Sequence, residues 1–399
     1  MKKNKFFEAS FNSFASLVSE RKNPKPGDES NYIGLEHMTP NRLHITNWGG
    51  DIELKGQKFA IKKGDILFAK RNAYLKRVSI APIDGIFSAH GMVFRPSGTA
   101  LADGFLPYFL LSRIFWDRAI SISEGSLSPT IKWGTLARQK FVIPDIETQN
   151  RSLKMLKRLT KQEKLINESL LCIDNSIRLF RKKVFDNYFD ILLHKRASLP
   201  PSWKYKRISE ILLSSPTSGN SINVVDRETH HYVLNLNCLT RYGFSANGYK
   251  TIEPDQFQPS LKLNQGDLLI SRSNTIDLVG LVGIYRDDEN RKAIFPDTMW
   301  RLDVNEDVID KEFLLNYLLS PYARREIQRI AAGSSGSMKK INKTEFGKVL
   351  VPVPPIKEQQ EINRILLGFE KTRHSLIQKQ ERVCSLRLSL INVLLEGSE

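Results

Sequence analysis

The feature that most constrains this chain is a long stretch of sequence that occurs twice. The segment GSLSPTIKWGTLARQKFVIPDIETQ, from Gly125, aligns with GSSGSMKKINKTEFGKVLVPVPPIKEQQEI, from Gly333, so that Pro144 and Gln149 match residues 210 positions later. Upstream, the Gly-Asp pair of IKKGDILFAKR matches the pair of LKLNQGDLLISRS, 202 positions later. Solenoid repeats are only about 20–50 residues long. The sequence therefore predicts two duplicated globular domains.

Each repeat ends in a segment whose apolar residues recur about every 3.5 positions, the period of a coiled coil. The first stripe consists of Leu156, Leu159, Ile166, Leu170, Ile173, Ile177, Phe180 and Val184, and the second of Ile362, Ile365, Phe369, Leu376, Val383, Leu386, Leu390 and Val393. Glu163 interrupts the first stripe, and Thr372 and Lys379 interrupt the second. Because 210 is a multiple of seven, both stripes have the same phase. We expect two long helices that pack against each other.

The predicted fold is mixed α/β (α+β), with two duplicated globular domains separated by two long helices packed as an antiparallel coiled coil. The antiparallel direction is expected because related copies pack most simply about a twofold axis. Each helix of roughly 37 residues would be about 55 Å long. The predicted bounds are 1–148 and 197–356 for the globular domains, and 149–196 and 357–399 for the spacer helices.

The charge of the chain favours a polyanionic partner. The formal net charge is +17, and residues 1–196 carry +14 of it. Nucleic acid is the commonest partner of so basic a protein, although a role in solubility alone is the alternative. Cys172, Cys238 and Cys384 are isolated, which is typical of a reducing cytoplasm. The sequence contains neither a secretory signal pattern nor an apolar run of about 18 residues.

Candidate nucleic-acid contacts follow the Gly-Asp segment in each copy. They are Lys70, Arg71, Asn72, Tyr74, Lys76 and Arg77 in the first copy, and Ser271, Arg272, Ser273 and Asn274 in the second. Lys and Arg bind phosphates or guanine, Asn binds adenine, and Tyr stacks or contacts the DNA backbone. The Gly/Ser stretches before the helices add Lys132 and Trp133, and Lys339, Lys340 and Lys343, beside backbone that suits a phosphate. The alternatives are a solvated charged turn and a plain flexible loop.

Several kinds of catalytic site are excluded by their required patterns. Gly333 and Gly336 lie too close together for a Walker loop, and the Lys-Ser/Thr pair is missing. The two Pro-Pro pairs lack the Asn or Asp of an amino-methyltransferase motif, and the Pro-Asp pairs at 144–145 and 296–297 lack the partners of a nuclease. His230 and His231 have no spaced third metal ligand. We therefore predict no catalytic residue, no metal site and no cofactor site in this chain.

The order of these segments resembles the specificity subunit of type I restriction–modification systems. The resemblance covers essentially the whole chain. It rests on the proline-and-glutamine entries VIPDIETQ and VPVPPIKEQQEI, on the strands that begin Gly-Asp-Ile-Leu and Gly-Asp-Leu-Leu, and on Leu-Pro-Pro-Ser-Trp at Leu199–Trp203. The first domain departs from this pattern, because it begins with FFEASFNSFASLV and has no matching Leu-Pro-x-x-Trp start.

The resemblance implies a DNA-reading subunit that is not itself catalytic. Each globular copy would be a target recognition domain that reads one half of a bipartite, asymmetric site in double-stranded DNA. The helices would set the spacing of the halves and dock two modification (methyltransferase) subunits, and restriction subunits would join afterwards. S-adenosylmethionine, ATP and magnesium would belong to those partners, in the cytoplasm. Two alternatives remain: the specificity chain of a fused restriction–methylation enzyme, and a coiled-coil scaffold or regulator.

Overall fold

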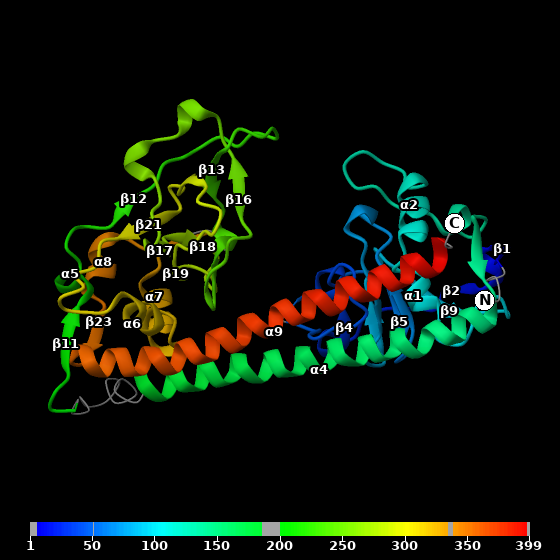
Figure 1. Ribbon diagram of the computed structural model, residues 1–399, viewed down its shortest axis with the longest axis horizontal. Helices are drawn as coiled ribbons and strands as arrows, with labels where there is room; N and C mark the ends of the chain where they lie inside the picture. Colours follow the sequence, from blue (N-terminus) through cyan, green and yellow to red (C-terminus); the bar gives the residue numbers. More distant parts are fainter. Residues whose placement is uncertain (1–5, 51, 186–199, 334–337, 397–399) are drawn as a thin grey trace. The chain divides into compact units, whose positions relative to one another are not determined.

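The computed structural model describes residues 6–50, 52–185, 200–333 and 338–396. The chain divides into two compact units, Met1–Leu171 with His374–Glu399, and Cys172–Arg373. Two long helices, α4 (Ile146–Phe185) and α9 (Ile356–Glu396), each contribute a segment to both units (Figure 1). Three expected features lie outside the described residues: the helical residues 186–196, Leu199 of the Leu-Pro-x-x-Trp start, and residues 334–337 of the second Gly/Ser stretch.

The first unit is built from two four-stranded sheets, β2-β9-β6-β7 and β3-β5-β8-β4, and an antiparallel pair, β1-β10. Its strands are β1 (Phe6–Ser10), β2 (Ala15–Val18), β3 (Arg21–Lys22), β4 (Tyr32–Ile33), β5 (Lys58–Ile61), β6 (Ile66–Phe68), β7 (Val78–Ile80), β8 (Gly85–Phe87), β9 (Met92–Pro96) and β10 (Lys140–Pro144). Its short helices are α1 (Leu106–Phe109), α2 (Arg113–Ser121) and α3 (Trp133–Leu136). Its core is rich in aromatic rings, among them Phe11, Phe68, Phe94, Phe115 and Trp116.

The second unit contains a four-stranded sheet, β12-β21-β17-β19, a three-stranded sheet, β16-β13-β20, and several strand pairs. Its strands are β11 (Lys204–Arg207), β12 (Thr217–Ser218), β13 (His231–Leu234), β14 (Leu239–Thr240), β15 (Gly243–Phe244), β16 (Tyr249–Thr251), β17 (Leu268–Ser271), β18 (Ser273–Asn274), β19 (Val282–Ile284), β20 (Lys292–Ile294), β21 (Met299–Leu302), β22 (Lys339–Lys340) and β23 (Leu350–Val353). Its short helices are α5 (Ile208–Ile211), α6 (Lys311–Leu318), α7 (Pro321–Ile330) and α8 (Lys343–Lys348). The mixed α/β class and the duplication are confirmed.

The Gly-Asp pair of the first copy forms the tight turn before β6. Gly64 has a φ of +94°, a left-handed conformation that favours glycine. The Asp65 carboxylate accepts the backbone N–H of Lys62 at 2.8 Å and two hydrogen bonds from the Arg95 guanidinium at 2.6 and 2.9 Å. The motif therefore sets the turn and holds it against the neighbouring strand β9.

The second copy repeats this turn before β17. Gly266 has a φ of +90°, and the Asp267 carboxylate accepts the backbone N–H of Asn264 at 2.9 Å. Arg301, on the neighbouring strand β21, forms an ion pair with Asp267 at 3.4 Å. The same two residue types thus perform the same structural task in both units.

The spacing of glutamine after proline, which both copies share, also has a structural cause. Gln149, in the first turn of α4, is completely buried. Its Oε1 accepts the Ala102 N–H at 2.7 Å, and its Nε2 donates to the carbonyl oxygens of Pro144 at 2.8 Å and of Ala100 at 3.1 Å. One side chain therefore ties the start of the helix to the loop before α1.

Gln359 makes the equivalent three hydrogen bonds at the start of α9. It is completely buried, its Oε1 accepts the Asp310 N–H at 2.7 Å, and its Nε2 donates to the carbonyl oxygens of Pro354 at 2.8 Å and of Val308 at 3.4 Å. An unpaired side-chain amide would be costly at such a buried position, and these hydrogen bonds satisfy the glutamine amide in both copies.

The N-terminal edge of the first unit corresponds to that of the second, although the sequences differ there. Strand β1 pairs antiparallel with β10, which leads into α4, and β11 pairs antiparallel with β23, which leads into α9. The expected Trp203 precedes β11, and its indole N–H donates to the Glu358 carboxylate at 2.8 Å. The segment FFEAS therefore opens the first unit without a tryptophan.

Within the first unit, α4 and α9 run antiparallel, as expected. Arg387 of α9 donates to the carboxylate of Glu163 on α4, and Gln380 of α9 donates to Asn167 of α4. Residue numbers along α9 therefore fall as the numbers of the α4 residues that they contact rise. Apolar side chains fill the contact, namely Leu159, Ile166, Leu170, Leu376, Val383 and Leu390.

The helix segments of the second unit are antiparallel as well. The Arg373 guanidinium donates to the Asp174 carboxylate at 2.7 Å, and Arg181 forms an ion pair with Glu370 at 3.4 Å. Arg181 also donates to the side-chain oxygen of Asn316 at 2.8 and 3.1 Å, and burial lowers the pKa of Arg181 to about 10. Polar pairs therefore continue along the contact between the two helices.

The expected seam of α9 is partly wrong. Three of its predicted members are exposed: Ile365, Leu386 and Val393. The predicted polar interruptions Thr372 and Lys379 are also exposed, and the buried or half-buried face instead carries Arg373, Gln380 and Arg387, one residue later in each heptad. An apolar periodicity cannot detect a face on which Arg and Gln are paired, which explains the error.

Candidate nucleic-acid interface

In the first unit, the backbone joins the two segments that the sequence proposed separately. Arg71 forms an isolated antiparallel bridge with Thr130. The Ile131 N–H donates to the Lys70 carbonyl oxygen at 2.9 Å, and the Asn72 N–H donates to the Pro129 carbonyl oxygen at 2.8 Å. The segment after β6 and the Gly/Ser stretch before α3 therefore form one edge, which brings Lys70 and Arg71 close to the chain around Lys132.

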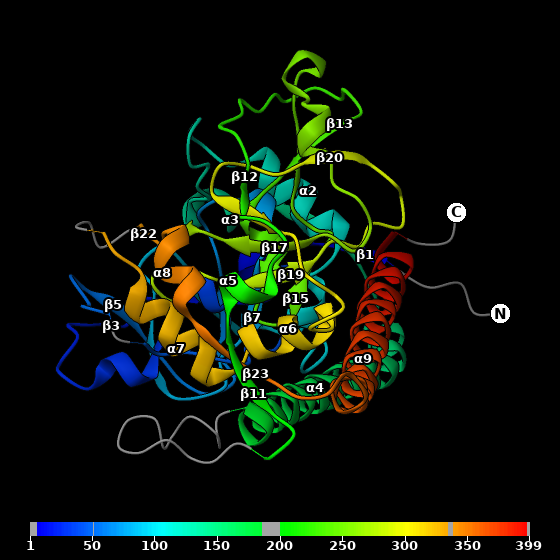
Figure 2. The same ribbon diagram turned by 90° about the vertical axis from the view of Figure 1, so that its left-hand side faces the viewer.

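The second unit repeats this junction. The Ile341 N–H donates to the Arg272 carbonyl oxygen at 3.0 Å, at the position equivalent to Ile131 and Lys70. Strand β18 then pairs antiparallel with β22, in the register Ser273 with Lys340 and Asn274 with Lys339. The expected loop after β17 is thus partly a strand, and in each copy a short helix, α3 or α8, separates the Gly/Ser stretch from the strand that enters the long helix (Figure 2).

Several predicted residues of the first unit are available at the surface. Arg71 and Tyr74 are exposed, and Lys76 is half-buried in the left-handed conformation, with a φ of 48°. Lys70 is half-buried, and burial, followed by the positive charge of Arg21, lowers its pKa. Lys132 is exposed and forms an ion pair with Glu124 at 2.6 Å. This edge combines cations, which bind phosphates, with an exposed tyrosine, which is able to contact the DNA backbone.

Three predicted residues of the first unit have structural roles instead. Arg77 donates to the Leu35 carbonyl oxygen at 2.9 Å, and burial lowers its pKa. Trp133 packs against the core rings of Phe11 and Phe94, with centroids 5.9 and 5.7 Å away. Asn72 adopts a φ of 55° in the turn, and its side-chain oxygen is buried. The sequence could not separate these roles, because the residue types suit either one.

The predicted serines of the second unit are buried. Ser271 is completely buried and Ser273 is 2 % exposed, so neither reaches a macromolecular partner in this conformation. Arg272 is half-buried, and its guanidinium lies 6.0 Å from the centroid of the Trp300 ring. The Asn274 side-chain oxygen accepts the Thr275 N–H at 2.8 Å. The expectation that Ser271 and Ser273 contact DNA directly does not fit their burial.

The lysines of the second unit surround the same edge. Lys339 donates from its Nζ to the Gly333 carbonyl oxygen at 2.6 Å. Lys340 and Lys343 are exposed, and within the described ranges neither forms an ion pair. These two cations are the predicted residues of this unit that are best placed to contact a phosphate.

Sequence reasoning missed one cation of the first edge. Arg21, on β3, is exposed, and its guanidinium lies 4.9 Å from the centroid of the Phe59 ring. Its charge contributes to the lowered pKa of Lys70. Arg21 precedes Lys70 by 49 residues, so only the folded chain brings the two together.

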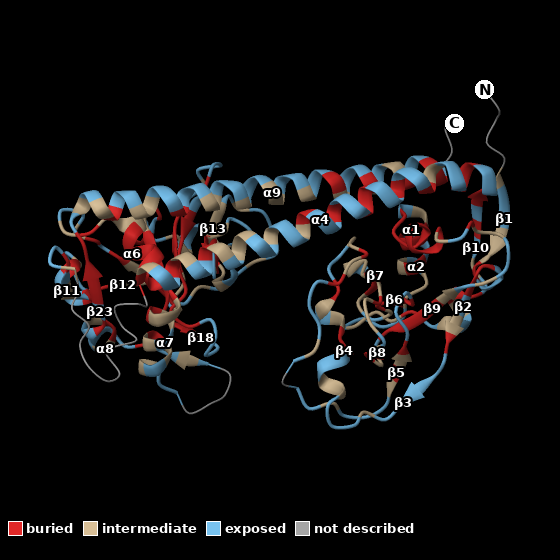
Figure 3. Ribbon diagram, turned by 90° about the horizontal axis from the view of Figure 1, so that it is seen from below, coloured by how far each residue is buried: buried red, intermediate tan, exposed pale blue. Residues whose placement is uncertain are grey.

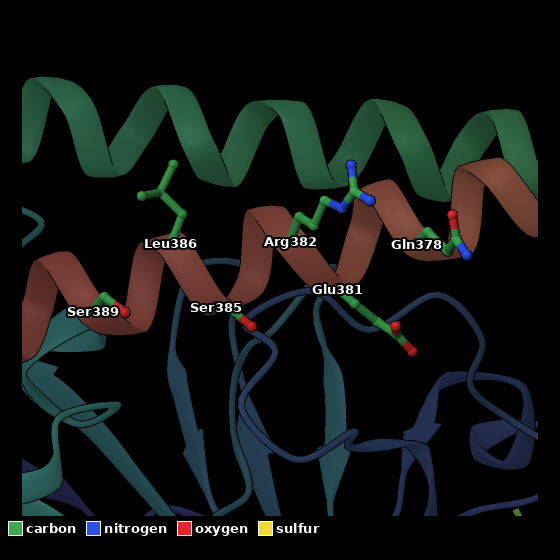
Figure 4. Close-up of a pocket in the computed structure, with 6 residues that line it drawn as sticks. All are labelled: Gln378, Glu381, Arg382, Ser385, Leu386 and Ser389. Carbon is green, nitrogen blue, oxygen red and sulfur yellow. The ribbon is translucent and has the colours of Figure 1, made fainter. Parts of the chain in front are cut away.

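A second surface feature lies along α9 in the first unit. A shallow groove of about 500 Å³ is lined by Gln378, Glu381, Arg382, Ser385, Leu386 and Ser389. Leu386 is 57 % exposed, and Figure 4 draws it with Arg382 on the side of α9 nearest to α4. Much of the surface of both long helices is exposed (Figure 3), including the apolar residues Met155, Leu165, Leu171, Leu179, Ile365, Leu367 and Val393.

Within the described part of the chain, no group of three or more His, Cys, Asp or Glu side chains is arranged to hold a metal ion. None of the helices described here combines the length and the apolar composition needed to cross a lipid bilayer.

Comparison with known proteins gives two matches to one family. The model of the type I restriction modification DNA specificity domain matches residues 11–173 and again residues 201–383. The EcoKI specificity subunit of Escherichia coli (strain K12), a type I restriction enzyme subunit, is 24% identical over 288 residues, which are 71% of this chain and 61% of that protein. The chain thus matches less than two thirds of this relative's length. The putative MjaX specificity subunit of Methanocaldococcus jannaschii is 22% identical, over 91% of this chain and 85% of that protein.

Solved structures share the fold. The S subunit of a type I restriction–modification system from M. genitalium aligns with a TM-score of 0.51 at 13% identity, over 100% of this chain and 98% of that one. A chain from a structure on complex assembly and conformational transition of the type I R-M system aligns with a TM-score of 0.50 at 17% identity, over 98% of both chains.

Proposed function

Because the chain belongs to the family of the type I restriction modification DNA specificity domain, we propose that it is the subunit that selects the DNA sequence for a type I restriction–modification complex. Each unit reads one half of a bipartite, asymmetric site in double-stranded DNA. The observation that carries this proposal is the edge that recurs in both units, where the segment after the Gly-Asp strand is joined by backbone hydrogen bonds to the Gly/Ser stretch.

The residues at the two edges differ, which supports recognition of a different DNA half-site by each unit. The first edge offers Arg71, Tyr74 and Lys132, and the second offers Lys340 and Lys343. Cations bind phosphates in any sequence, whereas different neighbouring side chains distinguish bases. A duplicated scaffold with unlike edges is what an asymmetric site requires.

We assign the chemistry to partner subunits. The chain would perform no catalytic step itself, and two modification subunits would supply methyl transfer from S-adenosylmethionine. Restriction subunits would supply the ATP- and magnesium-dependent steps. Such complexes would act in the cytoplasm, where the DNA lies.

The long helices are the proposed docking surface of the modification subunits and the element that sets the spacing of the half-sites. Both units present exposed apolar side chains on their helix segments, such as Leu165 and Leu386 in the first and Leu179 and Leu367 in the second. Exposed apolar side chains that gather on one element are typical of protein interfaces. One such surface on each unit fits two modification subunits.

Co-expression with the modification subunits tests the proposal. In a host without other DNA methylation, sequencing of modified bases should show one bipartite motif that depends on this chain. Omitting this chain while keeping the modification subunits is the matched control. Methylation that is independent of the chain, or a failure of the chain to co-purify with those subunits, would refute the proposal.

A further inference from the structure

The second unit contains a surface groove directly beside the candidate edge. The Thr298 carbonyl oxygen accepts the backbone N–H groups of Arg272 at 2.9 Å and of Ser273 at 3.3 Å. Thr298 also lines a groove of about 210 Å³, together with Asn235, Lys250 and Asp297. The groove is therefore continuous with the edge through a shared residue.

The groove is lined by both apolar and polar residues. Val233 and Leu234, at the end of β13, are buried members of its lining. Lys250 comes from β16, which pairs antiparallel with β13 (Figure 1), and Asp297 from the turn between β20 and β21. Two sheets thus place a cation and a carboxylate at the rim of one hollow.

The backbone of Asp297 is held in place, but its carboxylate is not neutralised. The Asp297 N–H donates to the Asn220 carbonyl oxygen at 2.9 Å, which anchors the turn. Among the described residues, no ion pair or side-chain hydrogen bond engages its carboxylate, and the residue is exposed. Asn235 uses its side-chain oxygen to accept the Leu236 N–H at 2.7 Å, so its NH₂ group is left to donate.

This donor and acceptor set suits the edges of bases. A carboxylate repels phosphates but accepts hydrogen bonds from amino groups, which cytosine N4 and adenine N6 display in the major groove. The corresponding turn before β9 in the first unit, SAHG at 88–91, contains no carboxylate. The two units therefore differ at this turn, as readers of unlike half-sites must.

We infer that Asp297 is a specificity-determining residue of the second unit, and that the groove around it, not Ser271 or Ser273, receives the base edges of double-stranded DNA. This inference rests on the proposed function. Asp297 accepts a hydrogen bond from the amino group of cytosine or adenine, while Lys250 binds the adjacent phosphate or a guanine edge.

The test maps methylation by the whole complex with wild-type chain and with Asp297→Asn, Asp297→Glu and Asp307→Asn. An amide both donates and accepts, so Asp297→Asn should reduce the preference for the cognate base at one position by about five- to 150-fold, and leave the other half-site unchanged. Asp297→Glu keeps a carboxylate and should keep the same base with slower methylation. Asp307→Asn removes an exposed carboxylate elsewhere in the unit and should change nothing.

The outcomes separate the two levels of the argument. A wild-type motif that stays identical, at the same methylation rate, in Asp297→Asn overturns the role of the groove and leaves the proposed function standing. Changes in both half-sites also overturn it, whereas no motif with the wild-type chain overturns both. If Asp297→Asn abolishes methylation, binding of the purified complex to a pool of duplex variants replaces the map, and an unaltered base preference there counts against the inference.

Discussion

The buried carboxylate of Glu163 provides a sharp test of how the first unit holds its two helix segments together. Its side chain is 1% exposed, and it accepts hydrogen bonds from Arg42 at 2.9 Å and from Arg387, whose side chain is completely buried. Arg387 also donates to the Asn41 carbonyl oxygen at 2.6 Å. The three side chains therefore connect α4, α9 and the loop before β5.

Glu163→Leu should destabilise the first unit by about 3–5 kcal/mol, because it leaves the Arg387 charge buried without its anionic partner. The double variant Glu163→Leu with Arg387→Leu removes both buried charges, and apolar replacements of buried pairs are often tolerated. Arg42 is partly exposed and is able to turn toward water. The double variant should therefore lose about 1–2 kcal/mol less unfolding free energy than the sum of the losses of the two single variants.

Urea-dependent hydrogen exchange, read by mass spectrometry on peptides from 153–171 and 374–391, measures this free energy of unfolding. Glu168→Leu is the matched control, because Glu168 lies on the same helix in an exposed pair with Lys164 at 3.9 Å, which is worth about 0–1 kcal/mol. A loss below about 1 kcal/mol for Glu163→Leu, or strict additivity in the double variant, would refute the reasoning.

Three further outcomes are expected. In salt titrations of DNA binding, Arg71→Gln or Lys340→Gln should each reduce the magnitude of the slope of log affinity against log salt by about 0.9. An unchanged slope would exclude a phosphate contact. Arg77→Gln is the control and should leave the slope unchanged, because Arg77 donates to the Leu35 carbonyl oxygen. Four residues inserted between Leu170 and Ile173 would lengthen α4 by about 6 Å. Methylation maps should then show the same half-sites one or two base pairs further apart, and an unchanged distance between the half-sites would exclude a spacing role for the helices. Burial raises the pKa of Cys238 to about 11, so at about pH 8 it is almost entirely thiol, and alkylation followed by mass spectrometry should modify the exposed Cys172 in the folded protein but Cys238 only after unfolding.

Sequence alone was sufficient for the duplication, the mixed α/β class and the two long helices. These features depend on local patterns that repeat along the chain, such as the Gly-Asp turn and the glutamine of each helix entry. Gly64 and Gly266 share a positive φ, and Gln149 and Gln359 share three hydrogen bonds each. A residue type that performs the same local task in two copies recurs at the same spacing in the sequence.

Only the tertiary structure decided which polar residues face solvent and which lie together. Ser273 and Trp133 looked like DNA contacts, but Ser273 is buried and the half-buried Trp133 packs against the core. Arg387 belonged to no predicted feature, and it is buried against Glu163. Asp297 comes to the candidate edge through the hydrogen bonds of its neighbour Thr298 with the backbone after β17, some 25 residues earlier in the chain. Burial and proximity arise from contacts between segments that are distant in sequence, and no local pattern of residue types records those contacts.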